Sequence, residues 1–227
     1  MKNLMIAVLW VVSLQAVGQQ TETRALNTFK GVKVSQAIDA YLKKGDKESA
    51  RVEVTGAKLT DVVTEVKEGM LKIKMREGLG FWKNVNVKVY VTYVNLEKIS
   101  ASSASSVFSD GVIKADHLDI GASSAANVEV KLDANSVMVD TSSAGEVVLE
   151  GKSLKLEIEA SSAGDVDAYK LESETVVAKV SSGGEAKISV SKDLEAHASS
   201  GGDIRYRGNP TRTNTHASSG GSVKKSN

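Results

Sequence analysis

The stretch "TSSAGEVVLEGKSLKLEIEASSAGDV", residues 141–166, contains the pattern that decides the fold. Two Ser-Ser pairs stand in it, each followed by Ala-Gly, and such pairs recur along the chain in steps of 18 to 21 residues. The seven pairs are Ser102-Ser103, Ser123-Ser124, Ser142-Ser143, Ser161-Ser162, Ser181-Ser182, Ser199-Ser200 and Ser218-Ser219. A period this even indicates an internal repeat in which each copy folds as one unit.

Apolar and polar residues alternate between consecutive pairs. In residues 154–160, Leu156 and Ile158 take one parity while Lys155 and Glu157 take the other. Period-two alternation predicts a strand with one buried face, and the small residues after each pair predict a tight corner. Because one such unit cannot bury its apolar face alone, the copies must stack. The sequence therefore predicts an all-β fold, a parallel β-solenoid with coils of about 19 residues spaced roughly 4.8 Å apart. A sandwich of hairpins, the competing architecture, gives no reason for that period.

The same parity places the second serine of each pair on the buried side. An unpaired buried hydroxyl costs about 1–3 kcal/mol, but stacked hydroxyls can donate to and accept from one another. We therefore expect an inward structural ladder formed by Ser103, Ser124, Ser143, Ser162, Ser182, Ser200 and Ser219. A nucleophilic serine would need a base and an orienting acid. His197 and His216 only repeat one structural position, so we assign no catalytic residue.

Four acidic residues follow the pairs at one fixed position: Glu146, Asp165, Glu185 and Asp203. In stacked coils they would face outward one above another, where like charges repel unless they are neutralised. Lys187 and Arg205 could neutralise them, and Ca²⁺, which favours carboxylates, is the other candidate. The four acids are therefore weak metal-site candidates, and we expect no other cofactor.

Residues 1–18 have the layout of a secretory signal peptide, with Lys2, an apolar run over residues 4–14 and a small-residue end at Gly18. The run is too short to cross roughly 30 Å of hydrocarbon, so we expect no transmembrane segment in the mature chain. We predict an exported protein in the periplasm, at the outer membrane or outside the cell, with a single domain over residues 19–227.

Composition excludes one class of partner. Removing residues 1–18 takes one of the 29 basic residues and none of the 28 acidic ones, so the mature chain is balanced at 28 of each. Scattered Lys without a basic stretch gives no electrostatic basis for binding nucleic acid. The chain contains no Cys, so no disulfide can form and stability must come from packing and hydrogen bonding.

Residues 24–100 keep the alternation but lose the serine corners. Since Val52 and Leu71 are again nineteen residues apart, we interpret this region as irregular early coils that also cap the solenoid end. The run "LTDVVTEV", residues 59–66, is a candidate short helix. Phe81 and Trp82 in "GFWKN" are the candidate binding residues, because exposed aromatic rings stack on sugars or partners.

The chain resembles the head GIN domain family, described as auto-transporter adhesin heads and known mainly from Bacteroidetes. The resemblance runs from about Arg24 to the C-terminus, and it is carried by "FKGVKVSQAIDAYLKKG", "LTDVVTEVKEGMLKIKM", "WKNVNVKVYVTYVNLEKISASSASSV" and the repeated small-residue corners. It implies a right-handed single-stranded β-helix in an exported, envelope-associated protein. It supplies no catalytic residues.

Three functions follow from these features. The first is a non-enzymatic, adhesin-like binding or scaffolding module of the cell envelope, whose partners would be surface glycans, matrix or envelope proteins. The second is a carbohydrate-active β-helix enzyme of the polysaccharide lyase or hydrolase type, which rests on fold analogy alone. The third is a self-associating structural protein that forms homo-oligomers.

Overall fold

The computed structural model describes residues 19–78 and 84–226. The candidate signal peptide, Phe81 and Trp82 lie outside the described residues. The elements are β1 (Gln20–Ala25), β2 (Gly31–Ser35), β3 (Asp39–Lys44), β4 (Ser49–Thr55), a 3₁₀ turn η1 (Leu59–Asp61), β5 (Val62–Lys67), β6 (Met70–Met75), β7 (Asn86–Tyr93), β8 (Lys98–Ser102), β9 (Ser106–Ser123), β10 (Asn127–Ser142), β11 (Glu146–Ala160), β12 (Asp165–Val180), β13 (Glu185–Ala198), β14 (Asp203–Arg207), β15 (Arg212–Ala217) and β16 (Ser222–Lys225).

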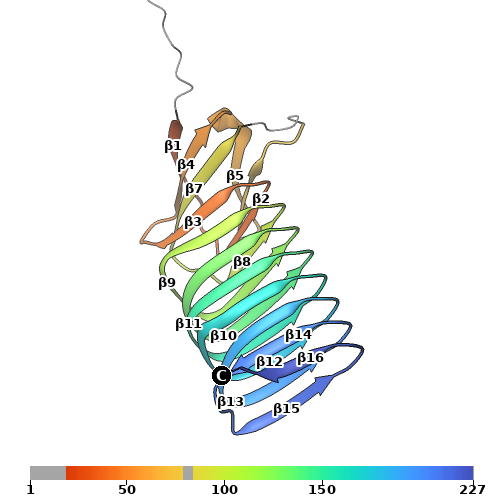
Figure 1. The fold of residues 1–227 in the computed structure, drawn as a ribbon. Coiled ribbons are helices and arrows are strands. Elements are labelled where there is room, and N and C mark those ends of the chain that lie inside the picture. The colour runs from red at the N-terminus through yellow and green to blue at the C-terminus, as the bar shows by residue number, and fades with distance from the viewer. Residues whose placement is uncertain (1–18, 79–83, 227) are drawn as a thin grey trace, which may run out of the picture.

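The regular half of the chain is a parallel β-solenoid, as predicted. Each of β9 to β13 is a long, bent strand that forms one coil, and each pairs in parallel with the next. Figure 1 shows the coils stacked along one axis. The register is direct: Val128 lies beside Val147, and Val147 beside Val166. Like side chains therefore form columns, and the inward columns of Val, Leu, Ile and Ala make one continuous core.

Each corner is a tight turn with an unusual backbone. The two central residues have positive φ, for example 50° at Ser143 and 58° at Ala144, and the N–H of Gly145 donates to the C=O of Ser142 over 2.9 Å. This geometry is that of a type I′ turn, in which Gly or Asn is usual at the two central positions. The sequence instead uses Ser-Ala in the early corners and Ser-Gly in the later ones.

The expected inward serine ladder is wrong. All seven second serines are exposed, because the type I′ turn rotates them out of the parity of the preceding strand. They do stack in a column, and the backbone holds that column: the N–H of Ala144 donates to the C=O of Ser162, and that of Ala163 to the C=O of Ser182. The serine hydroxyls themselves face solvent along an uncharged ridge.

The fourth corner residue is the one that must be small. A Cβ on Gly145 would lie 2.4 Å from the carbonyl oxygen of Ala122 and 2.9 Å from the backbone nitrogen of Ser123. A Cβ on Gly164, Gly184, Gly202 or Gly221 would also meet backbone atoms of the preceding coil, at 2.6 to 3.0 Å. Adjacent coils are therefore tightly packed at this position.

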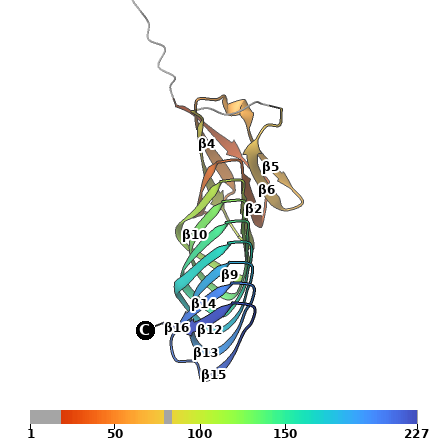
Figure 2. The same ribbon diagram turned by 45° about the vertical axis from the view of Figure 1, so that its right-hand side comes forward.

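The N-terminal region supplies one coil and an antiparallel cap. β2 and β3 pair in parallel with β8 and β9, and Gln36-Ala37 between them forms an eighth positive-φ corner. The other strands form antiparallel pairs, β1 with β4, β4 with β7, and β5 with β6, and β6 and β7 also pair in parallel with β2 and β3. Figure 2 shows β5 and β6 projecting beside the stack.

Two expectations about this region need correction. The nineteen-residue step from Val52 to Leu71 does not mark a coil, because Val52 pairs with Val89 and Leu71 with Val66 and Val32. The candidate helix at 59–66 is a single 3₁₀ turn followed by β5. Its β-branched residues Val62 and Val63 pair with β6, which overrides the weak helical signal.

Candidate functional site

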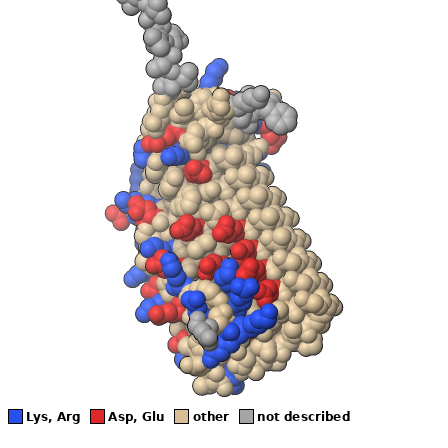
Figure 3. All heavy atoms as spheres, viewed as in Figure 1, with Lys and Arg blue, Asp and Glu red and all other residues tan. Residues whose placement is uncertain are grey.

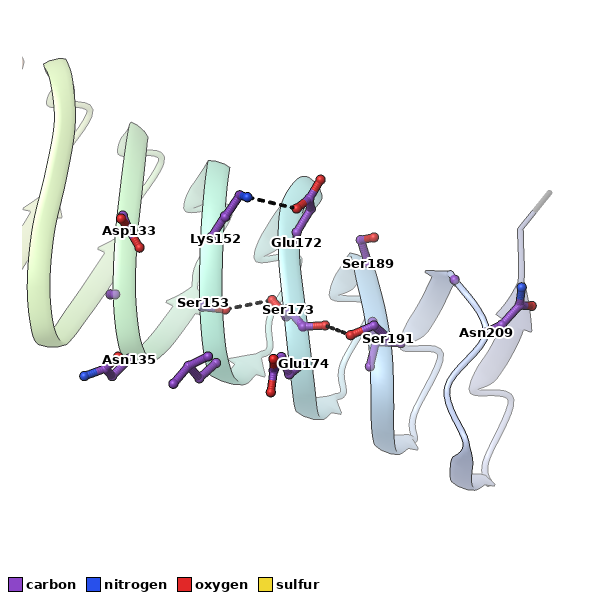
Figure 4. Close-up of a pocket in the computed structure, with 14 residues that line it drawn as sticks. Asp133, Asn135, Lys152, Ser153, Glu172, Ser173, Glu174, Ser189, Ser191 and Asn209 are labelled. Atoms are coloured by element: carbon purple, nitrogen blue, oxygen red, sulfur yellow. Dashed lines mark hydrogen bonds and ion pairs between the residues drawn. The ribbon is translucent and has the colours of Figure 1, made fainter.

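A large groove lies at the bend in the middle of each coil. Its volume is about 670 Å³, and it crosses β10 to β13 and the loop after β14. Five coils at roughly 4.8 Å spacing give it a length on the order of 20 Å along the stack. Figure 4 shows that each coil contributes a short run of residues at the same point of its bend.

Three of the inward residues at the bend are small. Ala134, Ser153 and Ser173 occupy one inward column, which Val190 continues in β13. Ser153 and Ser173 are only 4% and 3% exposed, and their hydroxyl oxygens are 2.8 Å apart in a hydrogen bond. Ser191 then donates to the C=O of Ser173 over 3.3 Å. The internal serine pairing that we expected at the corners thus occurs here, at the bend.

Two rows of outward side chains flank this small-residue column. One row is Asp133, Lys152, Glu172 and Ser189, and the other is Asn135, Leu154, Glu174 and Ser191. Lys152 pairs with Glu172 at 3.8 Å, and Lys192 with Glu174 at 2.5 Å. Leu154 is 52% exposed and is one of the few large apolar side chains at the surface.

The chemistry of the groove favours a neutral, hydroxyl-rich ligand. Its lining carries three carboxylates (Asp133, Glu172, Glu174) and one ammonium group (Lys152), a balance of −2. Lys192, which pairs with Glu174 beside the groove, reduces this balance to −1, and the remaining negative charge disfavours a polyanion. Carboxylate, amide and hydroxyl groups supply acceptors and donors in close succession, and Leu154 adds apolar surface, a mixture typical of ligand sites.

The predicted acidic column forms on the opposite half of each coil. Glu146 lies beside Asp165, Asp165 beside Glu185, and Glu185 beside Asp203. Lys187 pairs with Glu185 at 3.2 Å and Arg205 with Asp203 at 2.9 Å, so the two last acids have basic partners. Within residues 19–78 and 84–226, no group of three or more His, Asp or Glu side chains converges as a metal site would require. Calcium binding stays a prediction.

Asp165 is the perturbed member of this column. Burial raises the pKa of its carboxyl above the ordinary 3.8; Lys187 opposes that rise, and Glu185, Glu146 and Asp167 add to it. The folded state thus holds a proton on Asp165 more tightly than the unfolded chain does. The charged carboxylate therefore destabilises the fold once the pH exceeds the folded-state pKa, and this penalty vanishes below about pH 3.8.

Asp165→Asn is accordingly expected to raise the melting temperature at neutral pH and to leave it unchanged at about pH 3, where Asp165 is protonated in both states. Thermal unfolding followed by circular dichroism at the two pH values measures this. Asp140→Asn, at an exposed carboxylate on the other half of the coil, is the matched control and should change neither value. A lower melting temperature for Asp165→Asn at neutral pH would contradict the account.

Sequence reasoning missed the groove. Its residues fall at the middle of each repeat, where the alternation of apolar and polar residues slips, as in "LDANS" (132–136) and "LESET" (171–175). Register shifts between β11 and β12 and between β12 and β13 occur near these positions. The groove could have been predicted from one signal, which is the small residues at positions where the repeat elsewhere has an inward Val or Leu.

Comparisons with known proteins agree with the fold. A family model described as "Putative auto-transporter adhesin, head GIN domain" matches residues 28–210. A putative adhesin from Bacteroides fragilis NCTC 9343 superposes with a TM-score of 0.80 at 20% identity, covering 93% of this chain and 98% of that one. A putative adhesin from Parabacteroides merdae ATCC 43184 gives a TM-score of 0.72 at 18% identity, with 92% and 96% covered.

A third solved structure carries a different description. A "Putative lipid binding protein" from Parabacteroides distasonis ATCC 8503 gives a TM-score of 0.68 at 17% identity, covering 92% of this chain and 97% of that one. At these identities the likeness shows the fold alone. No curated protein matches the chain in a sequence comparison. Among the described residues, no helix is long and apolar enough to span a membrane.

Proposed function

We propose that this chain, which belongs to the head GIN domain family of putative auto-transporter adhesins, is a non-enzymatic binding module of the cell envelope that holds an extended neutral glycan in the groove across its coils. The family supports an adhesin-like, exported or surface protein. The groove supports the part of the proposal that concerns a glycan, because it runs across successive coils and offers polar groups at each of them.

The shape of the groove supports a chain-like ligand. Successive coils present Asp133, Lys152 and Glu172 in one row at the strand spacing, so a polymer lying along the axis would meet a polar side chain at each coil. Solenoids are suited to extended ligands for this reason. The floor is rigid, since Ser153 and Ser173 are buried and bonded to each other. A preformed site loses less entropy on binding.

A non-enzymatic role is part of the proposal. The groove carboxylates Glu172 and Glu174 are each paired with a lysine at 3.8 and 2.5 Å, and no pair of them is set apart as an acid and a base. Catalysis on a glycan would need two carboxyl groups with separated roles. The acids are instead members of rows that recur along the stack, which suits repeated hydrogen bonding.

A glycan array probed with residues 19–227 tests the proposal, followed by calorimetry on the best neutral ligand. Glu172→Ala/Glu174→Ala removes two acceptors from the groove and is expected to weaken binding at least about tenfold, or roughly 1.4 kcal/mol. Glu157→Ala/Glu159→Ala makes the same charge change outside the groove and should keep the affinity within about twofold.

Two results would contradict the proposal. One is binding to acidic glycans in preference to neutral ones, since the groove is net negative. The other is retention of binding in the groove variant together with its loss in Trp82→Ala, which would place the site at the "GFWKN" segment instead.

A further inference from the structure

A second feature of the solenoid is a face on which charge is divided into two zones. The face is formed by the first half of each coil, and it carries the column Glu129, Val148, Asp167, Lys187, Arg205, Lys224, in which each residue lies beside the next. Reading along the axis, the column changes from acidic to basic at Lys187. Figure 3 shows acidic side chains above basic ones on this face.

The acidic zone holds more carboxylates than its own neighbours neutralise. We define it as Glu129, Glu146, Asp165 and Asp167. None of the four forms an ion pair within 4.0 Å with another of the described residues. The Oδ1 atom of Asp165 is moreover buried without a hydrogen-bond partner in the described chain.

The basic zone carries an excess of positive charge. We define it as Lys187, Arg205, Arg207 and Lys224. Lys187 and Arg205 pair with Glu185 and Asp203, whereas Arg207 and Lys224 make no ion pair with the described carboxylates. Arg207 is held in place by stacking over the Tyr169 ring, 4.0 Å from its centroid. The positive excess therefore lies on exposed groups, one of which is ordered by an aromatic neighbour.

We propose that this face is the interface of an antiparallel homodimer, in which the acidic zone of one copy lies on the basic zone of the other. A two-fold axis that lies in the plane of the interface, perpendicular to the solenoid axis and near Lys187, brings the two faces together and exchanges the two zones, so one rotation makes both contacts favourable. A patch that complements itself in this way is the requirement for a closed two-fold dimer. A parallel arrangement would set like charges against each other, so the charge pattern also fixes the orientation.

Sedimentation of residues 19–227 at two salt concentrations tests the proposal. We expect a dimer at about 0.01 M salt, where the Debye length is about 30 Å, and a monomer at about 1 M, where it is about 3 Å. Glu129→Lys/Glu146→Lys and Arg207→Glu/Lys224→Glu should each be monomeric at low salt. An equimolar mixture of the two variants should form 1:1 heterodimers, because the altered zones attract each other.

The mixture separates the proposal from simple misfolding, since unfolded variants could not restore association. Asp140→Lys/Glu159→Lys makes the same change in charge on the other half of the coil and should dimerise like the parent chain. A parent chain that stays monomeric at low salt would overturn the proposal, as would dimers that persist in both single-zone variants or a mixture that fails to associate.

Discussion

Gly145→Ala is expected to lower the free energy of unfolding by about 3 kcal/mol, the upper part of the range for overpacked sites. The added Cβ would meet the carbonyl oxygen of Ala122 at 2.4 Å and its carbonyl carbon at 2.5 Å. Both are backbone atoms held by the ladder of the preceding coil, so neither can move aside as a flexible side chain would. Relief requires the two coils to separate at the corner, which breaks the hydrogen bond that the N–H of Glu146 donates to the C=O of Ala126.

Urea unfolding of residues 19–227 measures this loss. For a domain of this size, 3 kcal/mol corresponds to a melting temperature lower by roughly 6–12 °C. Gly121→Ala is the matched control, because a Cβ there would have no neighbour closer than 4.0 Å. It should fall within about 0.5 kcal/mol of the parent chain. Equal stability of the two variants would show that the corner is less tightly packed than described.

Leu156→Ala is expected to cost about 3 kcal/mol for a different reason. Leu156 is fully buried in the inward column, between Val137 in the coil before it and Val176 in the coil after it. Truncation removes apolar contacts to both neighbours and leaves a cavity, and buried Leu→Ala changes cost about 2–5 kcal/mol. Because each coil of a solenoid contacts mainly the adjacent coils, the loss falls on the interfaces with β10 and β12.

Leu154→Ala provides the control for that prediction. It removes the same atoms two residues away in the same strand, but Leu154 is 52% exposed in the groove. We expect its unfolding free energy to change by less than about 0.5 kcal/mol. If the two variants were equally destabilised, the assignment of inward and outward positions in β11 would be wrong.

The repeat made the solenoid predictable, while the corners show where sequence parity stops being reliable. Alternation assigns Leu156, Ile158 and Ala160 to the core correctly. It then carries the same parity into Ser162, where two consecutive residues of positive φ turn the chain. Because Ser and Ala rarely adopt positive φ, the residues of "SSAG" do not predict this turn. The serine ladder was therefore placed on the wrong side of the corner.

The cap and the groove were hidden for other physical reasons. In the N-terminal region, Val52 and Leu71 alternate with polar residues as in a coil. β4, which holds Val52, pairs antiparallel with β7, and β6, which holds Leu71, pairs antiparallel with β5 and parallel with β2. Alternation alone does not distinguish the two kinds of pairing. At the bend, Ser153 and Ser173 occupy inward positions with polar side chains. A single sequence read by hydrophobic parity treats such residues as outward, so the column that forms the groove floor is recognised only in three dimensions.

Hydrogen exchange of residues 19–227, with and without the best neutral glycan from the array, tests the binding account most directly. We predict that protection on binding is confined to the bend segments 133–135, 152–154, 172–174 and 189–191, which lie together in the groove but far apart in the chain. Protection confined to the serine corners or to the face that carries Glu146 and Asp165, with the bends unchanged, would contradict it.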